Sequence, residues 1–94
     1  LAADRFMAKY AKSGVNVVRI MVETPPSGNL EERVGLFRPE HVMWLDAVVL
    51  AGRKHGVRVW LTPYDTFWMN LRADASPYWV ENGGVVDPKN KVAW

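Results

Sequence analysis

The stretches KSGVNVVRI (residues 12–20) and KHGVRVWLT (residues 54–62) share a Lys-x-Gly-Val-x-Val core, and this internal repeat decides the fold. In each copy a glycine, Gly14 or Gly56, precedes a run of apolar and β-branched residues. The glycine suits the left-handed position just past a helix end, and the apolar run is typical of a buried strand. Each copy therefore predicts a helix end, a tight turn and the start of a strand.

A helical pattern precedes each copy. Before the first, apolar residues recur at spacings of three and four, as they do on one helix face: Ala3, Phe6, Met7, Tyr10 and Ala11. Before the second, Pro39 suits the first helical position and Glu40 complements the helix dipole there. Arg53, Lys54 and His55 then place positive charge just before Gly56, as is typical of a last helical turn.

The expected strands, residues 16–22 and 57–62, are nearly continuous apolar runs, so we expect burial on both faces, as in a parallel sheet. Helices that alternate with such strands indicate an α/β fold. Two long loops, residues 23–38 and 63–94, each follow the carboxyl end of a strand, whereas the turns that enter the strands are tight. This arrangement favours a (β/α)₈ barrel.

We expect the 94 residues to be one part of such a barrel's catalytic domain, from the first helix through the third strand and its loop. A doubly wound open sheet shares much of the pattern. However, neither strand is followed by a GxGxxG or GxxxxGK[ST] loop, so a nucleotide-binding version lacks its phosphate cradle.

Composition excludes several classes of function. The net charge is +2 with no basic run, which gives no electrostatic case for nucleic acid or an anionic membrane. No apolar run approaches the ~20 residues that span a bilayer. The chain has no cysteine and therefore no thiolate metal site. The sequence leaves the cellular location of the protein undecided, since secretion would require a signal peptide N-terminal to this segment.

Two stretches carry a resemblance to a known family. GVNVVRIMVE (residues 14–23) resembles the second-strand motif of clan A glycoside hydrolases, a Gly-x-Asn-x-Val-Arg-Ile/Leu run. PEHVMWLDAVVLAGRKHGVRVWLTPYDTFW (residues 39–68) resembles the following helix and third strand. The pattern is similar to glycoside hydrolase family 5, the cellulases and β-mannanases, and the similarity covers essentially the whole chain.

The resemblance implies cleavage of β-linked poly- or oligosaccharides by a retaining mechanism without a cofactor. The two catalytic glutamates would lie on the fourth and seventh strands, so no catalytic residue is expected within this segment. Arg19 matches the strand-two arginine that supports the catalytic carboxylates, although an arginine there could also face solvent or form a structural ion pair. Tyr64-Asp65 stands where many members have a histidine, which leaves the subfamily open.

Residues at the two strand ends are the candidates for substrate binding. Asp65 could accept hydrogen bonds from sugar hydroxyls, while Trp68, Tyr64 or Trp79 could offer a flat face to a pyranose ring. Glu23, at the end of the first strand, could bind a hydroxyl or serve as a cap or ion-pair partner. The alternative for Asp65 is a turn cap, and for the aromatic rings ordinary core packing.

Four further residues are interpreted structurally. Trp44 in a helix and Trp60 in a strand are expected in the core. His55 suits a helix C-terminus, and neither His41 nor His55 has a companion at metal-ligand spacing.

Two other functions remain open from the sequence. One is a metal-dependent sugar isomerase or epimerase barrel that uses Glu23 and Asp65 as oxygen ligands. The other is a barrel-derived protein that binds carbohydrate without cleaving it.

Overall fold

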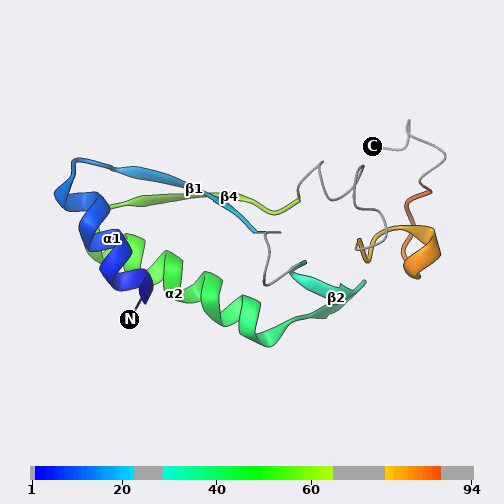
Figure 1. Cartoon of the computed structure of the whole chain (residues 1–94). Coiled ribbons are helices and arrows are strands. Elements are labelled where there is room, and N and C mark those ends of the chain that lie inside the picture. Colours follow the sequence, from blue (N-terminus) through cyan, green and yellow to red (C-terminus); the bar gives the residue numbers. More distant parts are fainter. Residues whose placement is uncertain (1, 23–28, 65–75, 88–94) are drawn as a thin grey trace. The chain divides into compact units, whose positions relative to one another are not determined.

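The computed structural model describes residues 2–22, 29–64 and 76–87. The chain divides into two compact units, Leu1–Ile20 with Pro39–Thr62, and Met21–Arg38 with Pro63–Trp94 (Figure 1). The first unit holds the repeat and its helices. The second unit holds the segments that follow the two strands.

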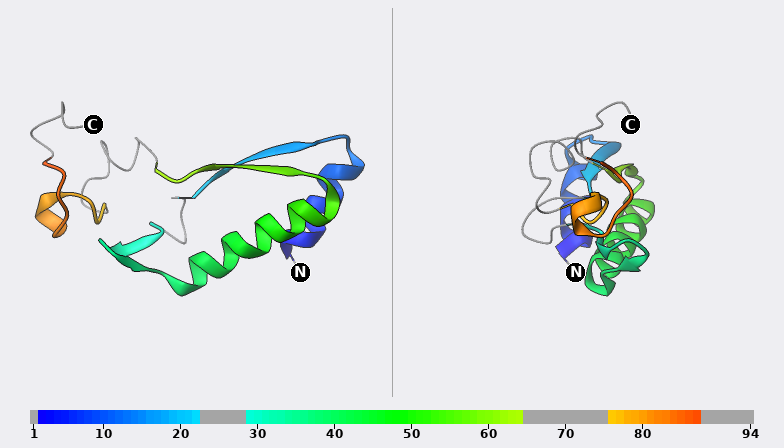
Figure 2. Two further views of the ribbon diagram at one scale, coloured as in Figure 1. Left: turned by 180° about the vertical axis from the view of Figure 1, so that it is seen from behind. Right: turned by 90° about the vertical axis from the view of Figure 1, so that its right-hand side faces the viewer.

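The first unit is a strand–helix–strand arrangement preceded by a helix. It contains α1 (Ala2–Lys12), β1 (Val17–Met21), α2 (Pro39–His55) and β4 (Arg58–Thr62). β1 and β4 pair in one sheet and lie side by side in both sets of views (Figures 1 and 2). The Arg58 N–H donates to the Asn16 carbonyl (2.8 Å) near the start of both strands, and Arg19 contacts Thr62 near their ends. The strands therefore run in the same direction, which confirms the predicted α/β class.

The helix boundaries follow the signals in the sequence. α2 begins at Pro39 with Glu40 in its first turn, and it ends in Arg53, Lys54 and His55. Gly14 and Gly56 have φ values of +84° and +70°, the left-handed conformation that only glycine adopts without strain. Both helices and both strand-entering turns are thus confirmed, and the strands begin within one residue of the expected positions.

The core of the first unit lies between the helices and one face of the sheet. Met7, Val48, Ala51 and Val57 are buried. The partly buried Val18, Ile20 and Val59 pack against this cluster from the sheet. Because side chains alternate along a strand, the residues between them lie on the opposite face.

That opposite face corrects one expectation. The strands were expected to be buried on both sides, but Val17 is 44% exposed and Trp60 is 64% exposed. Trp60 is therefore not a core residue of this chain. Trp44 is 42% exposed and also lies outside the core. Burial on both faces requires packing partners on both faces, and in the described structure the helices cover only one.

The second unit contains structure that the loop expectation missed. β2 (Glu31–Arg33) and β3 (Leu36–Phe37) form an antiparallel hairpin, with an irregular register between Glu31 and Arg33. A 3-10 helix, η2 (Val80–Asn82), lies between Trp79 and Val86, which form an isolated parallel bridge. These elements are too short to give a periodic sequence signal. Among the described residues, no helix has the length and apolarity to cross a membrane.

The close approach of α2 to β4 generates a stability prediction. A Cβ atom at Gly52 would lie 2.6 Å from the Val57 carbonyl oxygen and 3.0 Å from a Val59 methyl group. We expect Gly52→Ala to lower the free energy of unfolding by about 1–3 kcal/mol, because the helix must move away from the strand. Chemical unfolding followed by circular dichroism measures this change.

The sign of the stability change shows which of two effects is larger: the steric cost of the added methyl group or the higher helix propensity of alanine. Alanine is favoured over glycine by about 1 kcal/mol inside a free helix, so propensity alone predicts that the variant is more stable. Leu50→Ala serves as the control, because Leu50 lies on the same helix and is 63% exposed. A Gly52→Ala protein more stable than the parent would contradict the close approach.

Candidate functional site

Arg19 lies on the sheet face that the helices leave open. Its neighbours Val18 and Ile20 pack toward the core, so alternation along β1 places Arg19 on the other side. Its Nε donates a hydrogen bond to Thr62 Oγ1 (3.0 Å), and its guanidinium carbon lies 5.9 Å from the centroid of the Trp60 ring. The hydrogen bond and the cation–π contact hold the cation near the carboxyl end of the parallel pair.

The surroundings of Arg19 leave it able to bind an anion. It is exposed, and within the described residues no carboxylate pairs with it. A planar guanidinium has five N–H donors, of which one is engaged by Thr62. The remaining donors match the geometry of a carboxylate, which is the group that the predicted supporting role requires.

Among the substrate-binding candidates that the structure describes, Tyr64 has an accessible ring. It follows Pro63 just after β4, and it is 53% exposed. Its ring meets the ring of Tyr78 edge to face, with centroids 5.3 Å apart and an angle of 84° between the planes. Both tyrosines belong to the second unit, and the edge contact leaves much of Tyr64 exposed.

Trp79 has a different environment. It is 9% exposed, and its backbone forms the bridge to Val86. The indole Nε1 is buried, and within the described residues it has no hydrogen-bond partner. Trp79 is therefore buried in the described structure, and its stacking role stays a prediction.

Three predicted substrate-binding residues, Glu23, Asp65 and Trp68, lie outside the described residues. Their roles stay predictions. Among the residues that the structure describes, no group of three His, Cys, Asp or Glu side chains could hold a metal ion.

Sequence reasoning missed Glu31 and Tyr78. Glu31 on β2 is 8% exposed, and each of its carboxylate oxygens accepts a hydrogen bond. The Gly35 N–H donates to Oε2 (2.6 Å), and the Tyr78 hydroxyl donates to Oε1 (2.7 Å). The sequence gives no signal for this pair, since the two residues are far apart in the chain and neither belongs to a periodic pattern.

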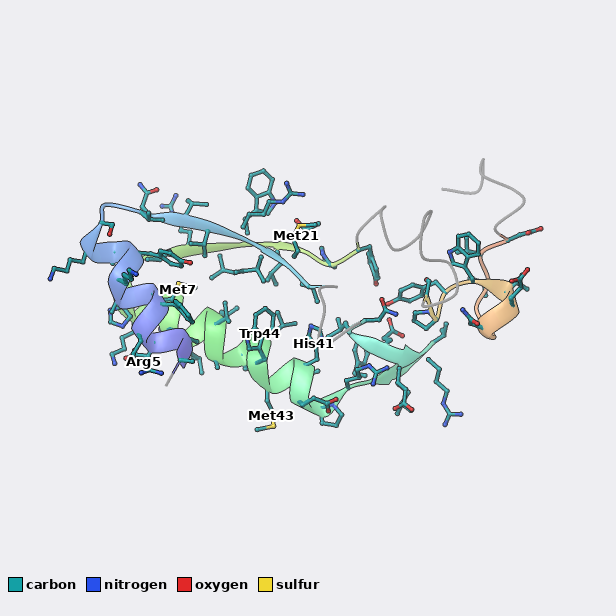
Figure 3. All side chains as sticks on the ribbon, viewed as in Figure 1. Arg5, Met7, Met21, His41, Met43 and Trp44 are labelled. Atoms are coloured by element: carbon teal, nitrogen blue, oxygen red, sulfur yellow. The ribbon has the colours of Figure 1, made fainter. Side chains whose placement is uncertain are left out.

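His41 is the most buried side chain of α2. It is 1% exposed, and within the described residues neither ring nitrogen has a hydrogen-bond partner. Its ring lies edge to face with Trp44, 5.7 Å between centroids. Both rings project from α2 toward the strands, whereas Met43 projects away from them (Figure 3). The sequence interpretation placed His41 correctly on the helix but did not anticipate its burial.

An apolar groove of about 570 Å³ runs beside Trp44. Its walls come from α1, β1 and α2, and they include Phe6, Tyr10, Ile20 and Trp44. Phe6 is 59% exposed and Tyr10 is 40% exposed, so this groove is open. The lining offers apolar contact but few polar groups to orient a ligand.

A charged cluster links the start of α1 to the end of α2. Asp4 Oδ1 lies 2.9 Å from Lys54 Nζ and 2.9 Å from His55 Nε2. The hydrogen bonds from Lys54 and then His55 lower the pKa of Asp4 from 3.8 to about 2. His55 was expected to complement the helix dipole, and the structure adds this interhelical contact.

Comparison with known protein families, with curated proteins and with solved structures finds no match for this chain.

The Asp4 cluster predicts a small pH dependence of stability. The pKa of Asp4 is lower in the folded chain, so its stabilising contribution is present above about pH 4 and is lost as the pH falls toward 2. We expect Asp4→Asn to be less stable than the parent at pH 7, with the difference shrinking between pH 4 and 2. Thermal unfolding at a series of pH values measures the difference.

The exposure of the cluster limits the effect, because solvent and salt screen it. Added salt at pH 7 should therefore bring the two proteins closer together. Asp46→Asn is the matched control, since Asp46 is exposed and lies on α2 outside the cluster. A difference for Asp4→Asn that stays constant from pH 7 to 2 would argue against the ionic contribution.

Proposed function

We propose that this chain is part of a (β/α)₈ glycoside hydrolase that cleaves β-linked poly- or oligosaccharides by a retaining mechanism. The observation that carries the proposal is the placement of Arg19 on the open sheet face, near the carboxyl ends of two parallel strands. In a (β/α)₈ barrel, helices cover the outside of the sheet and the site lies at the carboxyl ends. The resemblance of residues 14–23 to the second-strand motif supports the same assignment.

The open face carries exposed apolar residues beside Arg19 and Arg58. Val17 and Trp60 are large apolar residues with substantial exposure, and they lie on the same face as Arg19. Additional parallel strands closing the sheet would cover these side chains. The barrel would then bury the Arg19 aliphatic stem and keep its guanidinium at the end where the chemistry takes place.

Arg19 would support the catalytic residues rather than react. A retaining enzyme uses two carboxyl groups about 5 Å apart, one as nucleophile and one as acid and then base. A guanidinium beside the nucleophile favours its charged form and fixes its orientation. Thr62 and Trp60 would in turn fix Arg19. No metal or organic cofactor is required for this chemistry.

Substrate recognition would come from the segment that follows β4. Sugars have polar edges and weakly apolar faces, so their sites combine hydrogen-bonding groups with aromatic rings. The exposed ring of Tyr64 supports this role, and Asp65 and Trp68 follow it within four residues in the sequence. The proposed substrate is therefore a carbohydrate that binds to the residues following β4.

The first test of the proposal concerns Arg19 in the full-length enzyme that carries this segment. We expect Arg19→Lys to lower kcat by at least tenfold, because an ammonium group replaces the planar guanidinium, while the melting temperature stays near the parental value. Hydrolysis of an aryl β-glycoside measures kcat. Arg5→Lys is the control, since Arg5 is an exposed residue of α1 (Figure 3).

Assays of the parent enzyme distinguish the rival functions. A parent that hydrolyses no aryl β-glycoside but isomerises a free sugar only when a divalent ion is present would indicate the isomerase class. A parent that binds oligosaccharide but hydrolyses none would indicate a binding protein. Unchanged kcat in Arg19→Lys would contradict the supporting role of Arg19.

A second test concerns Asp65 and Trp68. Asp65→Asn keeps the shape of the side chain and removes its charge, and Trp68→Ala removes stacking area. If both contact substrate, each should lower kcat/KM by roughly tenfold or more, about 1.4 kcal/mol of transition-state binding, with little change in melting temperature. If Trp68 instead packs in the core, its truncation should cost roughly 3–5 kcal/mol of stability. Lower melting temperatures with parental kinetics per folded molecule would overturn the substrate role.

A further inference from the structure

Glu31 connects two segments that are distant in sequence. Its Oε2 accepts the Gly35 N–H within the hairpin, and its Oε1 accepts the hydroxyl proton of Tyr78 (2.7 Å). The residue is 8% exposed, and within the described residues no basic side chain pairs with it. A buried carboxylate in these surroundings depends on its two hydrogen bonds, so loss of either one is costly.

Tyr78 also contacts Tyr64. The two rings are edge to face at 5.3 Å, and Tyr64 is the more exposed of the pair. An edge-to-face contact restricts the tilt of the second ring, because the positive edge of one ring meets the negative face of the other. Glu31, Tyr78 and Tyr64 all belong to the second unit, so the connection is internal to one compact body.

The turn that carries Tyr78 is itself closely packed. The Asn82 side-chain amide donates to the Ser76 carbonyl (2.7 Å), and the Val86 N–H donates to the Tyr78 carbonyl (2.8 Å). Gly84 passes so close that a Cβ there would overlap the Tyr78 carbonyl group. The backbone of Tyr78 is therefore fixed, and its hydroxyl contact with Glu31 fixes the far end of the ring.

We propose that Glu31 and Tyr78 are positioning residues that orient the Tyr64 ring for sugar binding, an inference that rests on the proposed glycoside hydrolase function. Neither residue contacts substrate. The Glu31–Tyr78 hydrogen bond fixes the far end of the Tyr78 ring, and the edge-to-face contact with Tyr78 restricts the tilt of the Tyr64 ring. A flat pyranose face binds well only to a ring held in one orientation, so the pair contributes to substrate affinity.

The test uses steady-state kinetics of the full-length enzyme on a soluble β-linked oligosaccharide. Tyr64→Ala should raise KM roughly tenfold, the contribution of one stacked ring, and Tyr78→Phe should raise KM roughly three- to tenfold, the contribution of one hydrogen bond. In Tyr78→Phe, kcat should stay near the parental value. Glu31→Gln keeps an acceptor oxygen and should restore part of the loss that Glu31→Ala produces.

Matched controls come from the same chain. Tyr10→Phe removes the hydroxyl of a half-exposed tyrosine on α1, and Glu32→Gln changes the exposed neighbour of Glu31 on β2. Both should leave KM unchanged. Melting temperatures of all variants separate loss of orientation from loss of folding.

A double-mutant cycle decides whether Tyr78 acts through Tyr64. If it does, Tyr78→Phe raises KM in the parent but adds no further rise in a Tyr64→Ala background. An equal rise in both backgrounds, or a lower melting temperature with unchanged KM, overturns the inference while the glycosidase function stands. A parent enzyme that hydrolyses no β-glycoside overturns the proposed function itself, and with it the positioning role.

Discussion

The packing of α2 against β4 is the constraint on which the first unit depends. Gly52 lets the helix backbone approach the Val57 carbonyl, and this brings Val48 and Ala51 into the core beside Val57. Because β1 pairs with β4, the position of the helix also decides which face of the whole sheet is covered. The covered face takes Val18, Ile20 and Val59. The other face is left with Arg19 and Trp60, so the placement of the proposed site follows from one close contact.

Much of this unit could be predicted from the sequence, because its helix ends and strand starts are determined by residues close to them in the chain. Gly14 and Gly56 occupy left-handed positions that few other residues tolerate, and each is preceded by a helical pattern and followed by an apolar run. These signals lie within a few residues of the structure they determine. The β2–β3 hairpin gives no such signal, because Glu31-Glu32-Arg33 lacks apolar alternation and β3 has two residues. Its contacts include the Gly35 N–H to Glu31 hydrogen bond within the hairpin and the hydrogen bond from the distant Tyr78 hydroxyl to Glu31.

The candidate site was predictable to a similar extent. Arg19 stood out because a cation interrupts an apolar strand, and the structure places it on β1, while its supporting role stays a prediction. Its partners Thr62 and Trp60 depend on the register of β1 with β4, which the aligned repeat only approximates. The Glu31–Tyr78 hydrogen bond and the burial of Trp79 are long-range results of packing in the second unit. A pattern in one segment does not specify a partner in a distant one, and so neither was foreseen.

Two features of the first unit point to the same physical requirement. Trp60 and Val17 are exposed on the open sheet face, and Phe6 is exposed in the groove beside α1. Exposed apolar area costs free energy, and folded proteins rarely expose large contiguous patches of it. The neighbouring strands and helices of a closed barrel would cover both apolar surfaces. The proposed barrel is therefore supported by the energetics of this unit as well as by the position of Arg19.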